Sequence, residues 1–311
     1  MLKAIFTATI ALLLLVIPTF AAETGLESPV LPHRVYDMHT KNLMDFEGLL
    51  RRCAVADVVT LGENHGDRAT ERIELALLMG LARAGDGKVV LSMEMFERNI
   101  QDVVDEYLHD VIDEEEFLAS SNPPGNYKEA YRPLVEYCRA NGIPLIASNF
   151  PWTLGLKVGE VGYRSAVESY AEDERKWLPQ IYDAPEDAYF VKYKRTMMSI
   201  GGHGGMAGLT EEEVGRYYQN QILRDETMAE SVHRASMKYP DSTIYHIVGS
   251  FHVEDYFGTY ERIRKRMPSA DLVSILVRPV ADIDNASFDD IPGCDYVVFV
   301  IKEPDEGEGK T

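Results

Sequence analysis

Two histidines of this sequence each follow a glycine at the end of an apolar run. The stretch VVTLGENH contains Glu63 and His65, and the later stretch TIYHIVGSFH ends with His252, so both read as a strand followed by G-x-x-H. A third apolar stretch, VVLSMEMFER, contains Glu94. Because ligands bind outside the carboxyl ends of strands in open α/β sheets, we expect these side chains to share one crevice.

Two imidazoles and two carboxylates at one point support two kinds of chemistry. They could hold a divalent metal, for which the candidate ligands are His65, Glu94 and His252. They could also transfer protons, and Glu63 then joins the same three residues as a candidate catalytic group. Each residue alone has a plainer explanation, because a histidine at a strand end is often structural and Glu94 could cap a neighbouring helix. Their matching positions at three strand ends favour the shared site.

A basic, aromatic stretch of this acidic chain is a second candidate site. The run AYFVKYKRTMMSIGGHGGM (188–206) contains three cations, including Arg195, and no acidic residue, and it places His203 between glycine pairs. Tyr217 and Tyr218 follow on an expected helix. Apolar surface with a few cations suits a flat, apolar ligand that bears carboxylates. The alternative is a packed helix followed by a flexible loop.

Six apolar runs of strand length predict an α/β fold. Their hydrophobicity is continuous rather than alternating, which is typical of strands buried on both faces of a mostly parallel sheet. Helical patterns separate the runs, as in repeated strand–helix–strand units. The predicted strands are 58–62, 89–94, 143–148, 243–249, 272–277 and 296–301.

The helical patterns exceed what a minimal sheet of this kind needs. One pattern ends at Gly85, between the first two strands, and another ends at Gly142. A third begins with Thr210 and Glu213 at the spacing of a capping box. We therefore expect helices to flank the sheet and an inserted helical cap to pack beside it. The expected parts are an N-terminal arm at 23–45, a single domain at 46–303 with the helical insert at about 97–142 and 151–240, and an acidic disordered tail at 304–311.

Residues 1–22 are typical of a secretory signal peptide. Lys3 precedes an apolar run, and small residues then allow cleavage after Ala21 or Ala22. No cysteine lies at the cleavage point, so a lipid anchor is not indicated. We expect a periplasmic or secreted protein, attached to a membrane only if the segment stays uncleaved.

Net charge and cysteine content limit the possible partners and crosslinks. The formal net charge of −20 argues against a nucleic-acid partner, because the chain would repel phosphate. Cys53, Cys138 and Cys294 show no CxxC spacing, so a disulfide framework is not expected. One disulfide bond plus one free thiol stays open for an exported protein.

Five stretches resemble, in this order, the ChaN-like haem-binding uptake family of the Tiki superfamily: LGENH, SMEMFER, YKEAYRPLVEYCRANGIPLIASNFP, YQNQILRDETMAESV and VGSFH. The similarity covers about residues 55–300. Its more specific parts are the segment around Tyr131, Arg132 and Pro133 and the run 221–228, which contains Asp225. The superfamily also includes Tiki proteases and erythromycin esterases, in which the matching histidine acts as a base.

The resemblance implies a protein that handles haem during iron acquisition. ChaN-type proteins bind haem with a tyrosine as iron ligand, in a dimer that stacks two haems, so haem and a homodimer partner are expected. This chain has Trp152 where an arginine is common. The resemblance places the superfamily site on Glu63, His65, Glu94 and His252, and the haem-binding candidates are Tyr217, Tyr218, His203 and Arg195.

Two functions are therefore open at this point. The first is haem binding for transport or storage. The alternative is a hydrolase, in which the two histidines and a carboxylate bind a metal or His65 acts as the general base. A serine nucleophile is not indicated, since GSFHV does not fit the G-x-S-x-G pattern.

Overall fold

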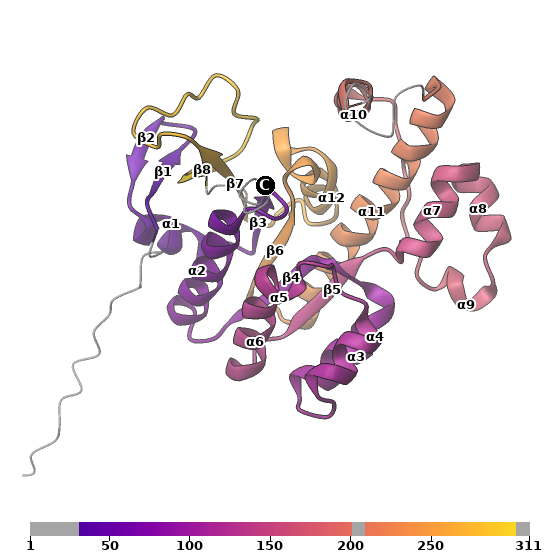
Figure 1. The fold of residues 1–311 in the computed structure, drawn as a ribbon, viewed down its shortest axis with the longest axis horizontal. Helices are drawn as coiled ribbons and strands as arrows, with labels where there is room; N and C mark the ends of the chain where they lie inside the picture. The colour runs from indigo at the N-terminus through magenta and orange to yellow at the C-terminus, as the bar shows by residue number, and fades with distance from the viewer. Residues whose placement is uncertain (1–30, 201–208, 303–311) are drawn as a thin grey trace, which may run out of the picture.

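The computed structural model describes residues 31–200 and 209–302, and it contains one eight-stranded sheet with helices on both faces (Figure 1). The predicted signal segment, His203 and the predicted tail lie outside the described residues. The strands are β1 (His33–Asp37), β2 (Asn42–Met44), β3 (Val58–Glu63), β4 (Val89–Glu97), β5 (Leu145–Asn149), β6 (Thr243–Gly249), β7 (Leu272–Val280) and β8 (Tyr296–Ile301).

The sheet is mostly parallel, and its strand order is β2-β1-β8-β7-β3-β6-β4-β5. Every pairing from β8 to β5 is parallel, whereas β1 pairs antiparallel with both β8 and β2. All six predicted strands form, and the predicted fold class is confirmed. Every residue of β3 and of β6 is buried, which explains why these runs are apolar without alternation.

Strands β1 and β2 were not predicted from the sequence, which placed residues 23–45 in an arm. Both are short, and β1 pairs with β8 from the other end of the chain. Its neighbour β2 pairs only with β1, so it forms the edge of the sheet.

Helices follow most strands, and α10 and α11 line a cleft at the strand ends. Helix α2 ends before Gly85, and Thr210 forms the expected capping box with Glu213 at the start of α11. The pattern that ends at Gly142 forms two helices, because the chain breaks at Tyr131. The helices are α1 (Phe46–Cys53), α2 (Arg68–Ala84), α3 (Gln101–Leu108), α4 (Glu114–Ser121), α5 (Tyr127–Ala130), α6 (Arg132–Asn141), α7 (Trp152–Val161), α8 (Tyr163–Ser169), α9 (Glu172–Arg175), α10 (Ala188–Ile200), α11 (Glu211–Lys238) and α12 (Gly258–Arg266).

Two apolar cores lie on the two faces of the sheet. Alternate residues of a strand point to opposite faces, so Leu61 joins the core formed with α1 to α6 and Val58 joins the core formed with α11 and α12. In Figure 1, α7 to α10 stand beyond the sheet edge, and α11 connects them to it. Two smaller apolar clusters hold these outer helices against α11.

All three cysteines lie in the described part of the chain, where they are buried free thiols. No helix in the described ranges is long and apolar enough to cross a membrane.

Candidate functional site

The ends of three neighbouring strands bring the predicted residues together. Strand β6 lies between β3 and β4, and Glu63 is in register with Gly249. The chain then makes a short 3-10 turn from Ser250 to His252, which returns the His252 ring toward the strand ends. Glu63, His65, Glu94 and His252 line one cleft.

Glycines at the ends of β3 and β6 create the space for these side chains. A Cβ on Gly249 would lie 2.8 Å from Nε2 of His65 and 3.4 Å from Oε2 of Glu94. A Cβ on Gly62 would lie 3.0 Å from the Cα of Ser250. The glycine of each G-x-x-H is therefore a packing requirement, since any side chain would displace the site or the turn.

Glu63 orients His65 and is itself held from a second element. The carboxylate of Glu63 bonds Nδ1 of His65 and accepts a hydrogen bond of 2.8 Å from the hydroxyl of Tyr131. The hydrogen bond to Glu63 raises the pKa of His65 despite partial burial, and the charge of Glu94 adds to the rise. Because a carboxylate only accepts, Nδ1 carries the proton and Nε2 is left for the cleft.

Glu94 is the charged centre of the cleft. Burial would raise its pKa, but His252, Arg224, His65 and the backbone N–H of Gly249 lower it to about 2. The guanidinium of Arg224 bonds Oε1 directly, and Nε2 of His252 lies 3.6 Å from the same oxygen. The β4–β5 register shifts between Met93 and Glu97, an irregularity of the kind that re-aims side chains beside active sites.

His252 has its own carboxylate partner. Its Nδ1 donates to Oδ1 of Asp225 at 2.6 Å, and Asp225 is fully buried. Thr259 and Tyr189 donate to Asp225 at 2.8 and 3.0 Å, which fixes its orientation. The amide nitrogen of Gln221 lies 3.3 Å from Nε2 of His252. Each histidine of the site is thus oriented through Nδ1.

The prediction of a divalent metal is not supported. Among residues 31–200 and 209–302, no group of three or more histidine, cysteine, aspartate or glutamate side chains is arranged to hold a metal ion. His65, Glu94 and His252 do converge, but Glu94 already bonds the guanidinium of Arg224. An arginine thus supplies the positive charge that a metal would bring.

The cleft has two lobes, which share the lining residues His65, Glu94, Trp152 and Arg224. The first lobe has a volume of about 560 Å³ and is bounded by α10 and α11. The second has about 510 Å³ and is bounded by the 122–126 loop and the end of β5. Aromatic and other apolar side chains form much of the wall of the first lobe: Trp152, Tyr193, Met197, Tyr217 and Phe251.

Comparison with known proteins places the chain in a family. The profile of the family described as "Haem-binding uptake, Tiki superfamily, ChaN" matches residues 49–263. The chain belongs to this family. The resemblance of the sequence motifs to ChaN-like proteins is therefore confirmed.

A solved structure confirms the ChaN-like fold. The structure described as "Cofacial heme binding to ChaN of Campylobacter jejuni" has a TM-score of 0.66 at 15% identity, over 88% of this chain and 97% of that chain. A mutant of erythromycin esterase EreC reaches a TM-score of 0.46 at 14% identity, over 88% of this chain and 83% of that chain, which carries no argument about activity. Protein RETICULATA-RELATED 5, chloroplastic, of Arabidopsis thaliana is 26% identical over 239 residues, 72% of this chain but only 31% of that protein.

The candidate haem-binding residues of this family member lie in different surroundings. Tyr217 lines the first lobe and is 36% exposed. Tyr218 is only 2% exposed, donates to the carbonyl of Pro185 and packs in the cluster between α10 and α11. Arg195 is exposed on α10 and does not line the cleft, and His203 is outside the described residues. Of the four candidates, the structure therefore places Tyr217 at the cleft.

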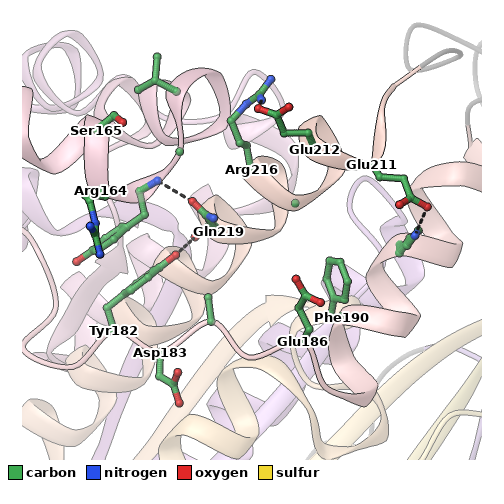
Figure 2. Close-up of a pocket in the computed structure, with 16 residues that line it drawn as sticks. Arg164, Ser165, Tyr182, Asp183, Glu186, Phe190, Glu211, Glu212, Arg216 and Gln219 are labelled. Carbon is green, nitrogen blue, oxygen red and sulfur yellow. Dashed lines mark hydrogen bonds and ion pairs between the residues drawn. The ribbon is translucent and has the colours of Figure 1, made fainter.

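A further cavity of about 820 Å³ uses a different face of α11 (Figure 2). Its charged side chains include neighbouring pairs, with Lys194 bonded to Glu211 and Arg216 bonded to Glu212. It shares no lining residue with the cleft at the strand ends.

Arg224, Asp225 and Gln221 belong to the site but were not predicted as functional residues. All three are on α11, far from the strand ends along the chain. One signal was present in the sequence, since Asp225 continues the helical spacing of the buried residues Ile222 and Met228. A carboxylate at an otherwise apolar position needs a buried partner, and His252 is that partner.

Proposed function

We propose that this protein is an exported haem-binding protein that serves haem uptake or handling. The observation that carries the proposal is an aromatic-walled cleft of about 560 Å³ at the strand ends of a ChaN family member. The ChaN protein of Campylobacter jejuni, which shares this fold, is described as binding haem cofacially, and this supports the same ligand here.

The residues of the cleft fit a haem group. Haem needs apolar surface against its faces, a protein atom that ligates iron, and partners for its propionates. The aromatic walls provide the apolar surface. Tyr217 or His65 can provide the iron ligand, since both side chains reach the cleft. Arg224 lies at the junction of the lobes and is a candidate propionate partner. When bound, haem would supply the iron centre, and the protein would hold and shield it.

The proposal includes export and self-association. Residues 1–22 carry the features of a signal peptide. The mass of the protein isolated from the native host's envelope should therefore equal that of a chain that starts at residue 22 or 23. Trp152 is 54% exposed at the rim of the cleft, and a second copy would cover such an apolar surface. Sedimentation with and without hemin tests whether two copies associate.

Hemin titration tests the main proposal. The wild-type protein should give a saturable shift of the Soret band, and Tyr217→Phe should weaken binding by about tenfold or change the spectrum of the bound iron. The matched control is Tyr218→Phe, the neighbouring tyrosine that lies outside the cleft, which should leave the spectrum unchanged. A wild-type spectrum identical to that of free hemin would refute haem binding.

Histidine-based hydrolysis is a second candidate function, and it rests on the paired histidines alone. The carboxylates of Glu63 and Asp225 hold His65 and His252 through Nδ1, an arrangement that suits a general base. A panel of esters and peptides, tested with wild-type, His65→Ala and His252→Ala proteins, decides the question. Turnover that both variants lose supports the activity, and no turnover by wild-type protein ends it.

A further inference from the structure

Helix α10 forms one wall of the cleft, and residues outside the cleft hold the helix in place. Tyr193, Thr196 and Met197 of α10 line the first lobe. Apart from its contacts with α11, the helix packs against Phe251 and Phe257, which lie on either side of the segment 252–256 and join the apolar cluster of Tyr193. The position of this wall therefore depends on what holds α10 against that segment.

Lys192 bonds α10 to two carboxylates of the segment 252–257. Its amine donates to Glu254 at 2.9 Å and to Asp255 at 2.8 Å, and its side chain is only 11% exposed. The same amine lies 5.2 Å from the centroid of the Phe251 ring. The Glu254 side chain is also only 13% exposed, so this ion pair is screened little by salt, whereas the Asp255 side chain is 38% exposed. Loss of the Lys192 amine removes a cation that the two carboxylates share.

The turn that Lys192 holds has an unfavourable backbone. Asp255 and Tyr256 have φ values of 57° and 60°, in the left-handed region that side chains other than glycine rarely adopt. Such conformations persist only where surrounding contacts hold them. Arg278 and Ser250 bind Glu254 at 2.5 and 2.9 Å, so Lys192 completes a set of contacts that begins on the sheet.

We propose that Lys192 is a positioning residue of the cleft, which couples the α10 wall to the segment 252–257 that begins at His252. Loss of the Lys192 amine releases two parts of the cleft together, α10 on one side and the turn at 252–257 on the other. A ligand that contacts Tyr193 or Met197 is thereby coupled to His252 without touching it.

Hydrogen–deuterium exchange of the full chain without ligand tests the coupling. In Lys192→Met, amides of α10 and of residues 252–257 should exchange about tenfold faster than in the wild-type protein, while core strands are unchanged. Lys192→Arg should restore slow exchange, because it keeps the charge. The matched control is Lys194→Met, which removes a lysine of the same helix that pairs with exposed Glu211 and should change exchange by less than about twofold.

Either of two results with the lysine variants would overturn the proposal. Lys192→Met could exchange like the wild-type protein, or Lys194→Met could produce the same increase in the same two segments. Asp255→Asn removes one of the two ion pairs. This second variant keeps the coupling testable if the Lys192→Met protein does not fold. It should give a smaller increase confined to α10 and 252–257, and unchanged exchange in both segments would also contradict the coupling.

The consequence for the ligand rests on the proposed haem function and is measured separately. Lys192→Met should weaken hemin binding by about fivefold or more relative to Lys194→Met, because the wall and the turn are no longer held together. If the wild-type protein does not bind hemin, the proposed function fails, and the exchange experiment still decides the coupling. If hemin binds equally to both variants, the coupling does not reach the ligand.

Discussion

At the scale of single residues, the cleft is organised by carboxylates that orient histidines. Glu63 and Asp225 each bond the Nδ1 atom of one imidazole, and Glu94 lies between the two rings. Such partners fix the ring and its tautomer, as carboxylates do for histidines that ligate metals or act as bases. This arrangement is compatible with both candidate functions.

Gly249→Ala should damage the site while leaving the fold intact. The new Cβ would lie 2.8 Å from Nε2 of His65, so the ring must move out of the cleft. We expect a loss of about 1–3 kcal/mol in the free energy of unfolding and weaker hemin binding. Urea denaturation and hemin titration measure both effects.

The control for that substitution is Gly215→Ala on α11. A Cβ at Gly215 meets nothing within 4 Å, so alanine should stabilise the helix by about 0.4–1 kcal/mol. If both substitutions changed the free energy of unfolding and hemin binding equally, the absence of a side chain at Gly249 would not be required for the position of His65.

Glu94 should make the protein sensitive to acid. Its folded pKa of about 2 is below its unfolded value, so ionised Glu94 contributes its full stability above about pH 4.3. That stability is lost as the pH falls toward about 2. Glu94→Gln should cost roughly 3–5 kcal/mol at pH 7, because Arg224 and His252 lose their shared counter-charge, and less at pH 3. Denaturation of both proteins at pH 7 and pH 3 measures the difference in their free energies of unfolding, and a difference that does not change with pH would contradict this account.

The sequence predicted the residues at the strand ends better than those on α11. Glu63, His65, Glu94 and His252 follow recognisable apolar runs, and parallel strands must end at the same edge. Arg224 and Asp225 lie inside a long helix, and only its rotation about its axis aims them at the cleft. The rotation of α11 is set by its packing against α7, α12 and β5, which the local sequence does not reveal.

At the scale of elements, α11 carries most of the newly identified polar groups of the cleft. It packs against the sheet through Met228 and Val232 and presents Tyr217, Gln221 and Arg224 to the ligand side. The six central strands could be predicted because burial on both faces gives each a continuous apolar run. Strands β1 and β2 lacked that signal, since β2 is a mostly exposed edge strand.

Removing the N-terminal cap of α11 should loosen the wall of the cleft. Thr210 accepts from the backbone N–H of Glu213, and Tyr217 lies two turns further on. Thr210→Ala should cost about 1 kcal/mol and weaken hemin binding several-fold, measured by denaturation and titration. The control is Asp113→Ala, which removes the corresponding cap of α4. It should have a similar stability cost with unchanged hemin affinity, and equal affinity losses would refute a specific role for the α11 cap.

At the scale of the whole molecule, the cores on both faces of the sheet protect the three thiols. Cys53 and Cys138 lie in the core formed with α1 to α6, and Cys294 lies in the core formed with α11 and α12. Burial raises the pKa of Cys53 and of Cys294 to about 12. Because the thiolate is the reactive form, these cysteines should stay reduced even in an oxidising compartment.

Thiol titration provides the test of that protection. The folded protein should not react with a disulfide reagent such as DTNB over minutes, and the protein unfolded in guanidinium should release three equivalents. Protein isolated from an oxidising compartment should give the same result, since reaction requires the cores to open. A titre of one thiol after unfolding would mean that two cysteines had paired. That pairing would require a packing different from the one described, in which all three cysteines are buried free thiols and Cys294 lies across the sheet from the other two.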